Sequence, residues 1–194
     1  APARATAVRT ILKQALADGR AAIRARFEAG DSGMQAARAM AALTDEVVRA
    51  LFTFATEVVY PAANPTKAER IALVATGGYG RGEMAPFSDV DLLFLLPYKQ
   101  TPWGEQVVEY LLYVLWDLGL KVGHASRSVD ECIRLSKADI TIRTSILDAR
   151  HLCGDQGLFQ ELRQRFQADI LANSGPAFVE AKLAERDDRH RKLG

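Results

Sequence analysis

Apolar side chains recur every three or four positions through the first 60 residues, a period that predicts amphipathic helices. The chain should turn at Asp18-Gly19, because glycine weakens a helix. Asp31 or Ser32 can cap a longer helix, and Pro61 closes it because proline lacks the N–H group that continues helical hydrogen bonding. Three helices are therefore expected, at 4–18, at 21–28 and from this cap to Pro61.

After residue 70 the pattern changes to short apolar runs. The runs at 71–75 and 90–96 are rich in branched and aromatic residues, so they are expected to be buried strands. Further strands are expected at 120–127 and 148–153, and helices at 105–118, 129–136, 139–146, 156–171 and 177–193. This order predicts an α+β fold, in which a small mixed β-sheet is flanked by helices and preceded by a helical N-terminal segment.

Two acidic residues mark the start of the second apolar run. Asp89 and Asp91 are two positions apart, and side chains alternate along a strand, so both should point to the same face. Two carboxylates on one buried face repel each other and are costly to desolvate. A cation removes both costs, and Mg²⁺ fits because it binds through one or two carboxylates and shares its other positions with water and phosphate oxygens. Both residues are therefore predicted metal ligands and catalytic residues.

A glycine-rich segment lies between these two predicted strands. Gly77 and Gly78 let the backbone approach a ligand closely, and their N–H groups can form a binding site for phosphates. A phosphate-binding segment followed by a strand with two carboxylates is suited to attack on a nucleotide α-phosphate.

Two side chains near the glycines have competing interpretations. Arg81 can neutralise the charge of a leaving pyrophosphate, or it can pair with Glu83 or Asp89. Ser88 can contact phosphate, or it can cap the strand that follows it. We predict that both residues contribute to nucleotide binding, with these structural alternatives left open.

The segment TGGYGRGEMAPFSDVDLLFL (76–95) resembles the signature of the nucleotidyltransferase superfamily that includes DNA polymerase β. Within it, the chain is most similar to the N-terminal domain of bacterial PII uridylyltransferase/uridylyl-removing enzymes. The segments that carry this narrower resemblance are WDLGLKVGHASRSVDEC (116–132), TSILDARHLCGD (144–155) and RHRKLG (189–194). The resemblance covers about residues 70–194, whereas the first 60 residues match only in being helical.

The resemblance implies a chemistry for the site. Two Mg²⁺ ions would be held by Asp89 and Asp91 against the phosphates of UTP, with Gly77 and Gly78 at the β- and γ-phosphates. A tyrosine hydroxyl of the PII signalling protein would attack the α-phosphorus and release pyrophosphate. A tyrosine hydroxyl has a pKa near 10, so its proton needs help to leave. The choice of uracil over adenine rests on the resemblance alone.

The superfamily generally has a third carboxylate on a neighbouring strand. The expected strand, 120–127, carries Val122-Gly123-His124 and no acid. Asp148 is the nearest substitute, if a strand that begins there lies beside 120–127; otherwise it can pair with Arg143 or Arg150. His124 is a second candidate for proton transfer, although a lone histidine in a strand is more often structural.

The resemblance also divides the chain. Residues 1–65 are expected to form a helical segment that packs on the core, and residues 66–175 the nucleotidyltransferase core. Residues 176–194 are expected to form a charged helix that leads towards a downstream domain absent from this chain. The hydrolase and glutamine-sensing domains of the resembled enzymes would also lie outside it.

Composition narrows the class of partner. The net charge of +1 is spread along the chain, without the basic stripe of proteins that bind nucleic acid. No apolar run is long enough to cross a membrane and no signal peptide is evident, so a cytoplasmic protein without a membrane partner is expected. Cys132 and Cys153 form no metal motif and are expected to be free thiols.

Three other functions stay open. The first is a related adenylyltransferase with another target, such as glutamine synthetase. The second is a regulatory domain that binds a nucleotide without turnover, which the missing third acid favours. The third is a purely structural α/β domain. Transfer of label from UTP or ATP, and nucleotide-dependent stabilisation, would separate them.

Overall fold

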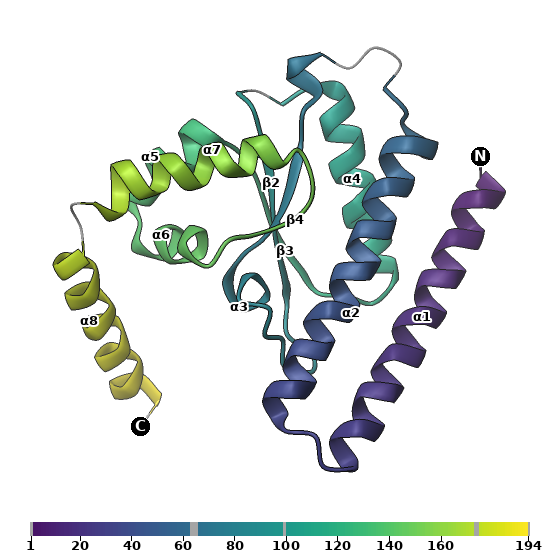
Figure 1. Ribbon diagram of the computed structural model, residues 1–194, viewed down its shortest axis with the longest axis horizontal. Coiled ribbons are helices and arrows are strands. Elements are labelled where there is room, and N and C mark those ends of the chain that lie inside the picture. The colour runs from purple at the N-terminus through teal and green to yellow at the C-terminus, as the bar shows by residue number, and fades with distance from the viewer. Residues whose placement is uncertain (1, 63–65, 99, 173–174, 194) are drawn as a thin grey trace.

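A four-stranded sheet lies at the centre of the computed structural model, with helices on both of its faces (Figure 1). The structure describes residues 2–62, 66–98, 100–172 and 175–193. The strands are β1 (Ala72–Ala75), β2 (Val90–Leu96), β3 (Val122–Ser128) and β4 (Arg150–Gly154), in the order β3-β2-β1-β4. β1 is antiparallel to β2 and β4, whereas β2 and β3 are parallel. The predicted α+β fold with a small mixed sheet is confirmed.

The N-terminal segment is a pair of long helices, α1 (Pro2–Glu28) and α2 (Gly33–Phe54). The predicted turn at Gly19 is wrong, because α1 continues through it. A Cβ atom at Gly19 would lie 2.6 Å from a side-chain carbon of Leu43, so this glycine lets α1 approach α2 closely. Ser32 caps α2 in a reciprocal capping box with Gln35, as the sequence predicts.

Each face of the sheet has its own apolar core because side chains alternate along β2. Leu92 and Phe94 face α1, α2 and α4 (Pro102–Asp117), whereas Leu93 and Leu95 face α5 (Val129–Ala138) and α7 (Gln156–Phe166). The two helix layers are visible on either side of the strands in Figure 1. α1 and α2 belong to the same core as the sheet, so the N-terminal helices pack on it as expected.

Helix ends follow the predicted signals in the middle of the chain. Thr101 caps α4, whose C-terminal turn is closed by Gly119 at φ +77°. Ser128 and Glu131 form a capping box that begins α5, where a helix is expected at 129–136. The ambiguous segment after residue 139 is helical, as α6 (Ile140–Leu147), and Asp139 caps it.

The last strand lies at an unexpected edge. The possibility that β4 lies beside the third strand is excluded, because β4 pairs with β1 and β3 lies at the opposite edge of the sheet. Asp148 is not in β4; it is the C-terminal cap of α6. Short-range patterns predict a strand but not its neighbour, since pairing depends on the path of the whole chain.

The remaining segments join or extend these elements. α2 runs on as a π-helical turn (Ala55–Val59), and a 3₁₀ turn (Lys67–Glu69) precedes β1. The expected boundary at residue 65 lies outside the described part of the chain, which leaves out residues 63–65 and 173–174. α7 is likewise extended by a π-helical turn (Gln167–Leu171).

The last helix, expected at 177–193, is α8 (Gly175–Leu193). It stands beside the α6 side of the molecule in Figure 1. The proposed boundaries at residues 65 and 175 stay predictions.

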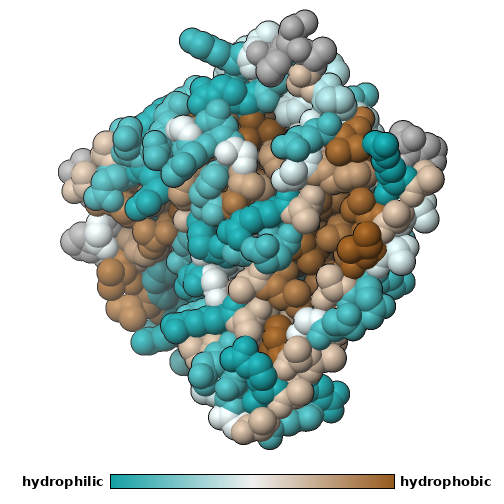
Figure 2. Space-filling model, turned by 45° about the vertical axis from the view of Figure 1, so that its right-hand side comes forward, coloured by the Kyte–Doolittle hydropathy of each residue, from teal (hydrophilic) through white to brown (hydrophobic). Residues whose placement is uncertain are grey.

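Apolar side chains also reach the surface between the first two helices. Ile11, Phe54 and Val58 line a shallow groove there, and Figure 2 shows apolar side chains among polar ones on this side of the molecule. None of the helices in the described ranges combines the length and apolar character that crossing a bilayer requires. Cys132 and Cys153 are free thiols, as expected, and burial raises the pKa of each to about 12.

Candidate active site

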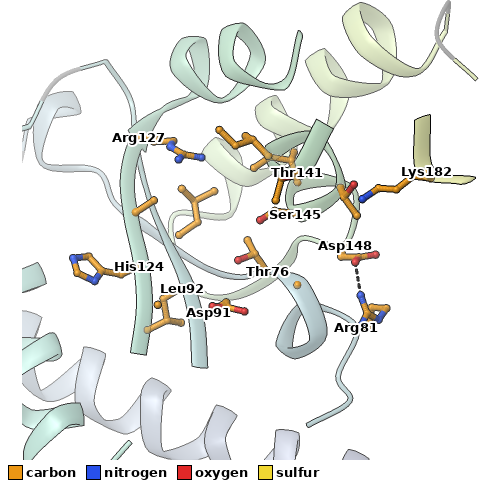
Figure 3. Close-up of a pocket in the computed structure, with 17 residues that line it drawn as sticks. Thr76, Arg81, Asp91, Leu92, His124, Arg127, Thr141, Ser145, Asp148 and Lys182 are labelled. Atoms are coloured by element: carbon orange, nitrogen blue, oxygen red, sulfur yellow. Dashed lines mark hydrogen bonds and ion pairs between the residues drawn. The ribbon is translucent and has the colours of Figure 1, made fainter. Parts of the chain in front are cut away.

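A cavity of about 430 Å³ opens between the sheet and α6. It lies at the ends of β2 and β3 where α3 (Gly77–Gly80) begins (Figure 3). Its charged lining comprises Arg81, Asp91, Arg127, Asp148 and Lys182. Three positive charges around the cavity favour an anionic ligand, and the carboxylates among them favour one that also brings a cation.

The Asp91 carboxylate occupies space that two glycines leave open. Asp91 is the second residue of β2 and is in register with Gly123 of β3. A Cβ atom at Gly123 would lie 2.5 Å from Oδ1 of Asp91, and one at Gly77 would lie 3.0 Å from Oδ2. Gly77 also has φ +58°, a conformation that favours glycine. Both strands and the glycine turn therefore shape the surroundings of this carboxylate.

Asp89 lies one residue before β2 and is exposed. Burial raises the pKa of Asp91, and the negative charge of Asp89 raises it further. The two carboxylates are therefore close enough to repel each other, as their spacing predicts. Asp89 itself lies outside the cavity lining.

The donor set fits a metal that needs few protein ligands. No three His, Cys, Asp or Glu side chains come together as a possible metal site in the described ranges. Mg²⁺ commonly takes one or two carboxylates and completes its coordination with phosphate and water. Asp89 and Asp91 fit this ion when a polyphosphate supplies the other oxygens, whereas a metal held only by protein side chains does not fit.

The glycine segment forms one helical turn, α3, where a loop was expected. Its first N–H groups have no acceptor within the helix, because a helix leaves its first turn of donors unpaired. Gly77 lines the cavity, but Gly78 does not. Gly80 allows α3 to pack closely against the end of α6, since a Cβ atom there would lie 2.2 Å from the backbone oxygen of Asp148. Phosphate binding by Gly77 and Gly78 stays a prediction.

Arg81 and Asp148 pair with each other across the cavity. Their side chains are 2.5 Å apart, Nη1 to Oδ2 (Figure 3). Arg81 therefore pairs with a residue 67 positions away, and not with Glu83 or Asp89, the two partners that the sequence suggested. Arg143 instead donates to the backbone oxygens of Ser136 and Lys137. Asp148 thus reaches the same cavity as Asp91, although it does so from α6.

Two other sequence candidates lie apart from the carboxylates. Ser88 belongs to a turn, in which its N–H donates to the backbone oxygen of Ala85, and it lines a different cavity. His124 is at the rim of the first cavity but points away from Asp91 in Figure 3, towards Trp116, with 6.2 Å between ring centroids. Binding of phosphate by Ser88 stays a prediction.

Sequence reasoning offered Arg150 only as a partner of Asp148 and missed that it holds the glycine turn in place. Its guanidinium donates to both carboxylate oxygens of Asp45 in α2, at 2.6 and 3.0 Å. It also donates to the backbone oxygens of Tyr79 and Gly80, at 3.1 and 3.2 Å. The hydrogen bond to Asp45 is the main reason that the pKa of Arg150 is raised. One signal was available: Asp45 is a charge on the apolar stripe of α2, so it needed a partner.

The fold and the cavity have the features of the nucleotidyltransferase class: a mixed sheet, a glycine turn, and a carboxylate pair at the start of the next strand. The chain belongs to the family described as "Putative nucleotidyltransferase DUF294", whose profile matches residues 17–127. This range contains Gly77, Asp89, Asp91 and Gly123 but ends before Asp148.

Curated relatives are long enzymes. A bifunctional uridylyltransferase/uridylyl-removing enzyme of Azospirillum brasilense is 63% identical over 183 residues, which cover 94% of this chain and 20% of the relative. The enzyme of the same description from Caulobacter vibrioides (strain NA1000 / CB15N) is 58% identical over 184 residues, 95% of this chain and 20% of the relative. The chain therefore spans about a fifth of the length of these relatives.

Proposed function

We propose that this chain transfers UMP from UTP to a tyrosine hydroxyl of the PII signalling protein in the cytoplasm. The observation that carries the reaction type is the Asp91 carboxylate, set between two glycines in a cavity with three cationic side chains. The choice of UTP is supported by relatives that are named uridylyltransferases. The choice of PII is supported by the family resemblance of the 116–132 and 144–155 segments.

Asp89 and Asp91 are the residues that would hold Mg²⁺. When bound, this ion would supply charge neutralisation at the phosphates and would make the α-phosphorus more open to attack. The chain itself would bind the triphosphate through the N–H groups of the glycine turn and through the positive charges of Arg81, Arg127 and Lys182.

The transfer exchanges one phosphorus–oxygen bond for another. The tyrosine oxygen forms a bond to the α-phosphorus, and the bond from this phosphorus to the oxygen bridging to the β-phosphate breaks, so pyrophosphate leaves with that electron pair. The hydroxyl proton needs an acceptor, and Asp148 is the third carboxylate at the cavity. We propose that Arg81 leaves Asp148 for the triphosphate, which frees Asp148 to accept this proton.

The test is transfer of radioactive α-phosphate from UTP or ATP to purified PII protein with Mg²⁺. We expect label from UTP, at least about 100-fold less label with Asp91→Asn, and no change with Asp18→Asn, an exposed acid on α1. Label on glutamine synthetase from ATP, with none on PII, would instead indicate the related adenylyltransferase.

A second candidate is a nucleotide-binding regulatory domain. It is favoured by the absence, within the described residues, of a cluster of three metal-binding side chains. Binding of UTP with Mg²⁺, together with no label on any acceptor, would support this function over transfer.

A further inference from the structure

A second cavity, of about 450 Å³, lies on the opposite face of the sheet from the first. It is enclosed by α1, α2, the segment 84–88 and the turn 119–121. Its floor is apolar, and two of its residues, Met84 and Leu120, belong to the core under α1 and α2. The volume is in the range of ligand and side-chain binding sites.

The charges around this cavity have one sign. Among the described residues that line it, Arg20, Arg24 and Lys121 are basic and none is acidic. Arg24 is paired with Glu28 at 2.8 Å, whereas no described acidic side chain pairs with Arg20 or Lys121. An apolar cavity with a basic rim is complementary to an apolar side chain that is flanked by acidic residues.

An aromatic side chain stands at the same rim. Phe87 is 94% exposed and has φ +70°, a conformation that a bulky residue rarely adopts. The segment that carries it is anchored, because the N–H of Met84 donates to the backbone oxygen of Ala37 and the N–H of Ser88 to that of Ala85. An aromatic residue presented to solvent in this way is typical of a contact with another protein.

The second cavity adjoins the candidate active site. Ser88 lines the second cavity and Asp91, three positions further on, lines the first, so their Cα atoms are at most about 11 Å apart. Lys121 also lines the second cavity, and Gly123, two positions further on, lines the first. The N–H of Val90 donates to the backbone oxygen of Lys121 at 2.7 Å. A segment bound in the second cavity can therefore reach past the N-terminal ends of β2 and β3 to the Asp89–Asp91 pair.

We propose that the second cavity is the docking site for the protein acceptor, whose loop inserts an apolar side chain while acidic neighbours contact Arg20 and Lys121. This inference rests on the proposed transfer to a protein, and it adds how that protein is recognised. Phe87 packs against the docked loop, and the loop's hydroxyl is presented at Asp89 and Asp91. The nucleotide enters from the other face of the sheet, so the two substrates do not compete.

The test measures binding of PII protein to the whole chain by calorimetry, beside label transfer from UTP. Arg20→Glu with Lys121→Glu, and separately Phe87→Ser, should each raise the Kd for PII about tenfold or more. Both should leave stabilisation by UTP with Mg²⁺ unchanged. Matched controls are Arg134→Glu on α5 and Ile11→Ser on α1, which are exposed and outside this cavity; they should leave the Kd unchanged.

The outcomes separate the docking site from the transfer. An unchanged Kd in the cavity variants, with label still transferred by the unaltered chain, would overturn the docking site alone. Weakened binding in those variants, without label from the unaltered chain, would support docking and overturn the transfer. An unaltered chain that neither binds nor labels PII overturns both. A dimer of the chain that Phe87→Ser dissociates would show that a second copy occupies the cavity, which also overturns acceptor docking.

Discussion

The surroundings of Asp91 are made by residues that lack side chains. Gly123 and Gly77 each face one oxygen of its carboxylate, at 2.5 and 3.0 Å from where a Cβ atom would be. The two glycines therefore leave the room in which the carboxylate takes this direction before any ligand binds. Such positioning is valuable for a metal ligand, because neighbours that orient a ligand also govern affinity.

Gly123→Ala tests this positioning. The added methyl group must displace the Asp91 carboxylate, so we expect a roughly 10- to 100-fold loss of UMP transfer and of affinity for Mg²⁺. The free energy of unfolding should change little, because the carboxylate can rotate away. Gly33→Ala is the matched control, since a Cβ atom there would meet nothing within 4 Å. Equal activity of the two variants would contradict the role of Gly123.

For single residues, the sequence predicts which side chains belong to the site more readily than which residues they contact. The period of a strand predicts that Asp89 and Asp91 point to one face; the structure places Asp91 in β2 and Asp89 one residue before it. The pair between Arg81 and Asp148 joins positions 67 residues apart, and nothing in the local pattern indicates it. The role of Gly123 was equally invisible, because it depends on the parallel register of β2 and β3.

Among the elements, α2, α3 and β4 are joined by Arg150. Its guanidinium pairs with Asp45, binds two backbone oxygens of the glycine turn and lies 5.6 Å from the centre of the Tyr79 ring. The Asp45 side chain is only 10% exposed, and its shortest ion pair is with Arg150, at 2.6 Å, beside a longer one with Arg49, at 3.5 Å. The shape of the glycine turn is therefore coupled to the N-terminal helices.

Arg150→Met should lower the free energy of unfolding by about 2 kcal/mol, because it leaves the buried carboxylate of Asp45 with only the longer pair to Arg49, at 3.5 Å. Urea denaturation measures this loss. Arg165→Met is the control; it removes a surface pair with Asp130 and should cost less than about 1 kcal/mol. Similar midpoints and slopes for both variants would show that the Arg150 network does not stabilise the fold.

Elements were predicted well where local signals suffice and poorly where packing decides. Capping boxes at Ser32 and Ser128 begin helices where expected, because the cap is made within four residues. Gly19 was misread as a break, since its purpose is close contact with Leu43 of another helix. The neighbour of β4 could not be predicted, because strand order is a property of the chain path.

The whole molecule places two cavities on opposite faces of one sheet, and both approach the N-terminal ends of β2 and β3, where Ser88 and Lys121 line one cavity and Asp91 and Gly123 line the other. Neither cavity could be predicted from the sequence, because each is assembled from four or more separate segments. The class of reaction was predictable, since the glycine turn and the two carboxylates lie within 15 consecutive residues, 77–91. The proposed function requires that the cavity at Asp91 binds a nucleotide together with Mg²⁺.

Thermal and urea unfolding with UTP and Mg²⁺ test that claim most directly. With UTP at 100 times its Kd, the free energy of unfolding should rise by about 2.7 kcal/mol, and removing Mg²⁺ or introducing Asp91→Asn should abolish most of this rise. Asp18→Asn should keep it in full. Stabilisation that is equal with and without Mg²⁺ or Asp91, or no stabilisation of the unaltered chain, would contradict the account.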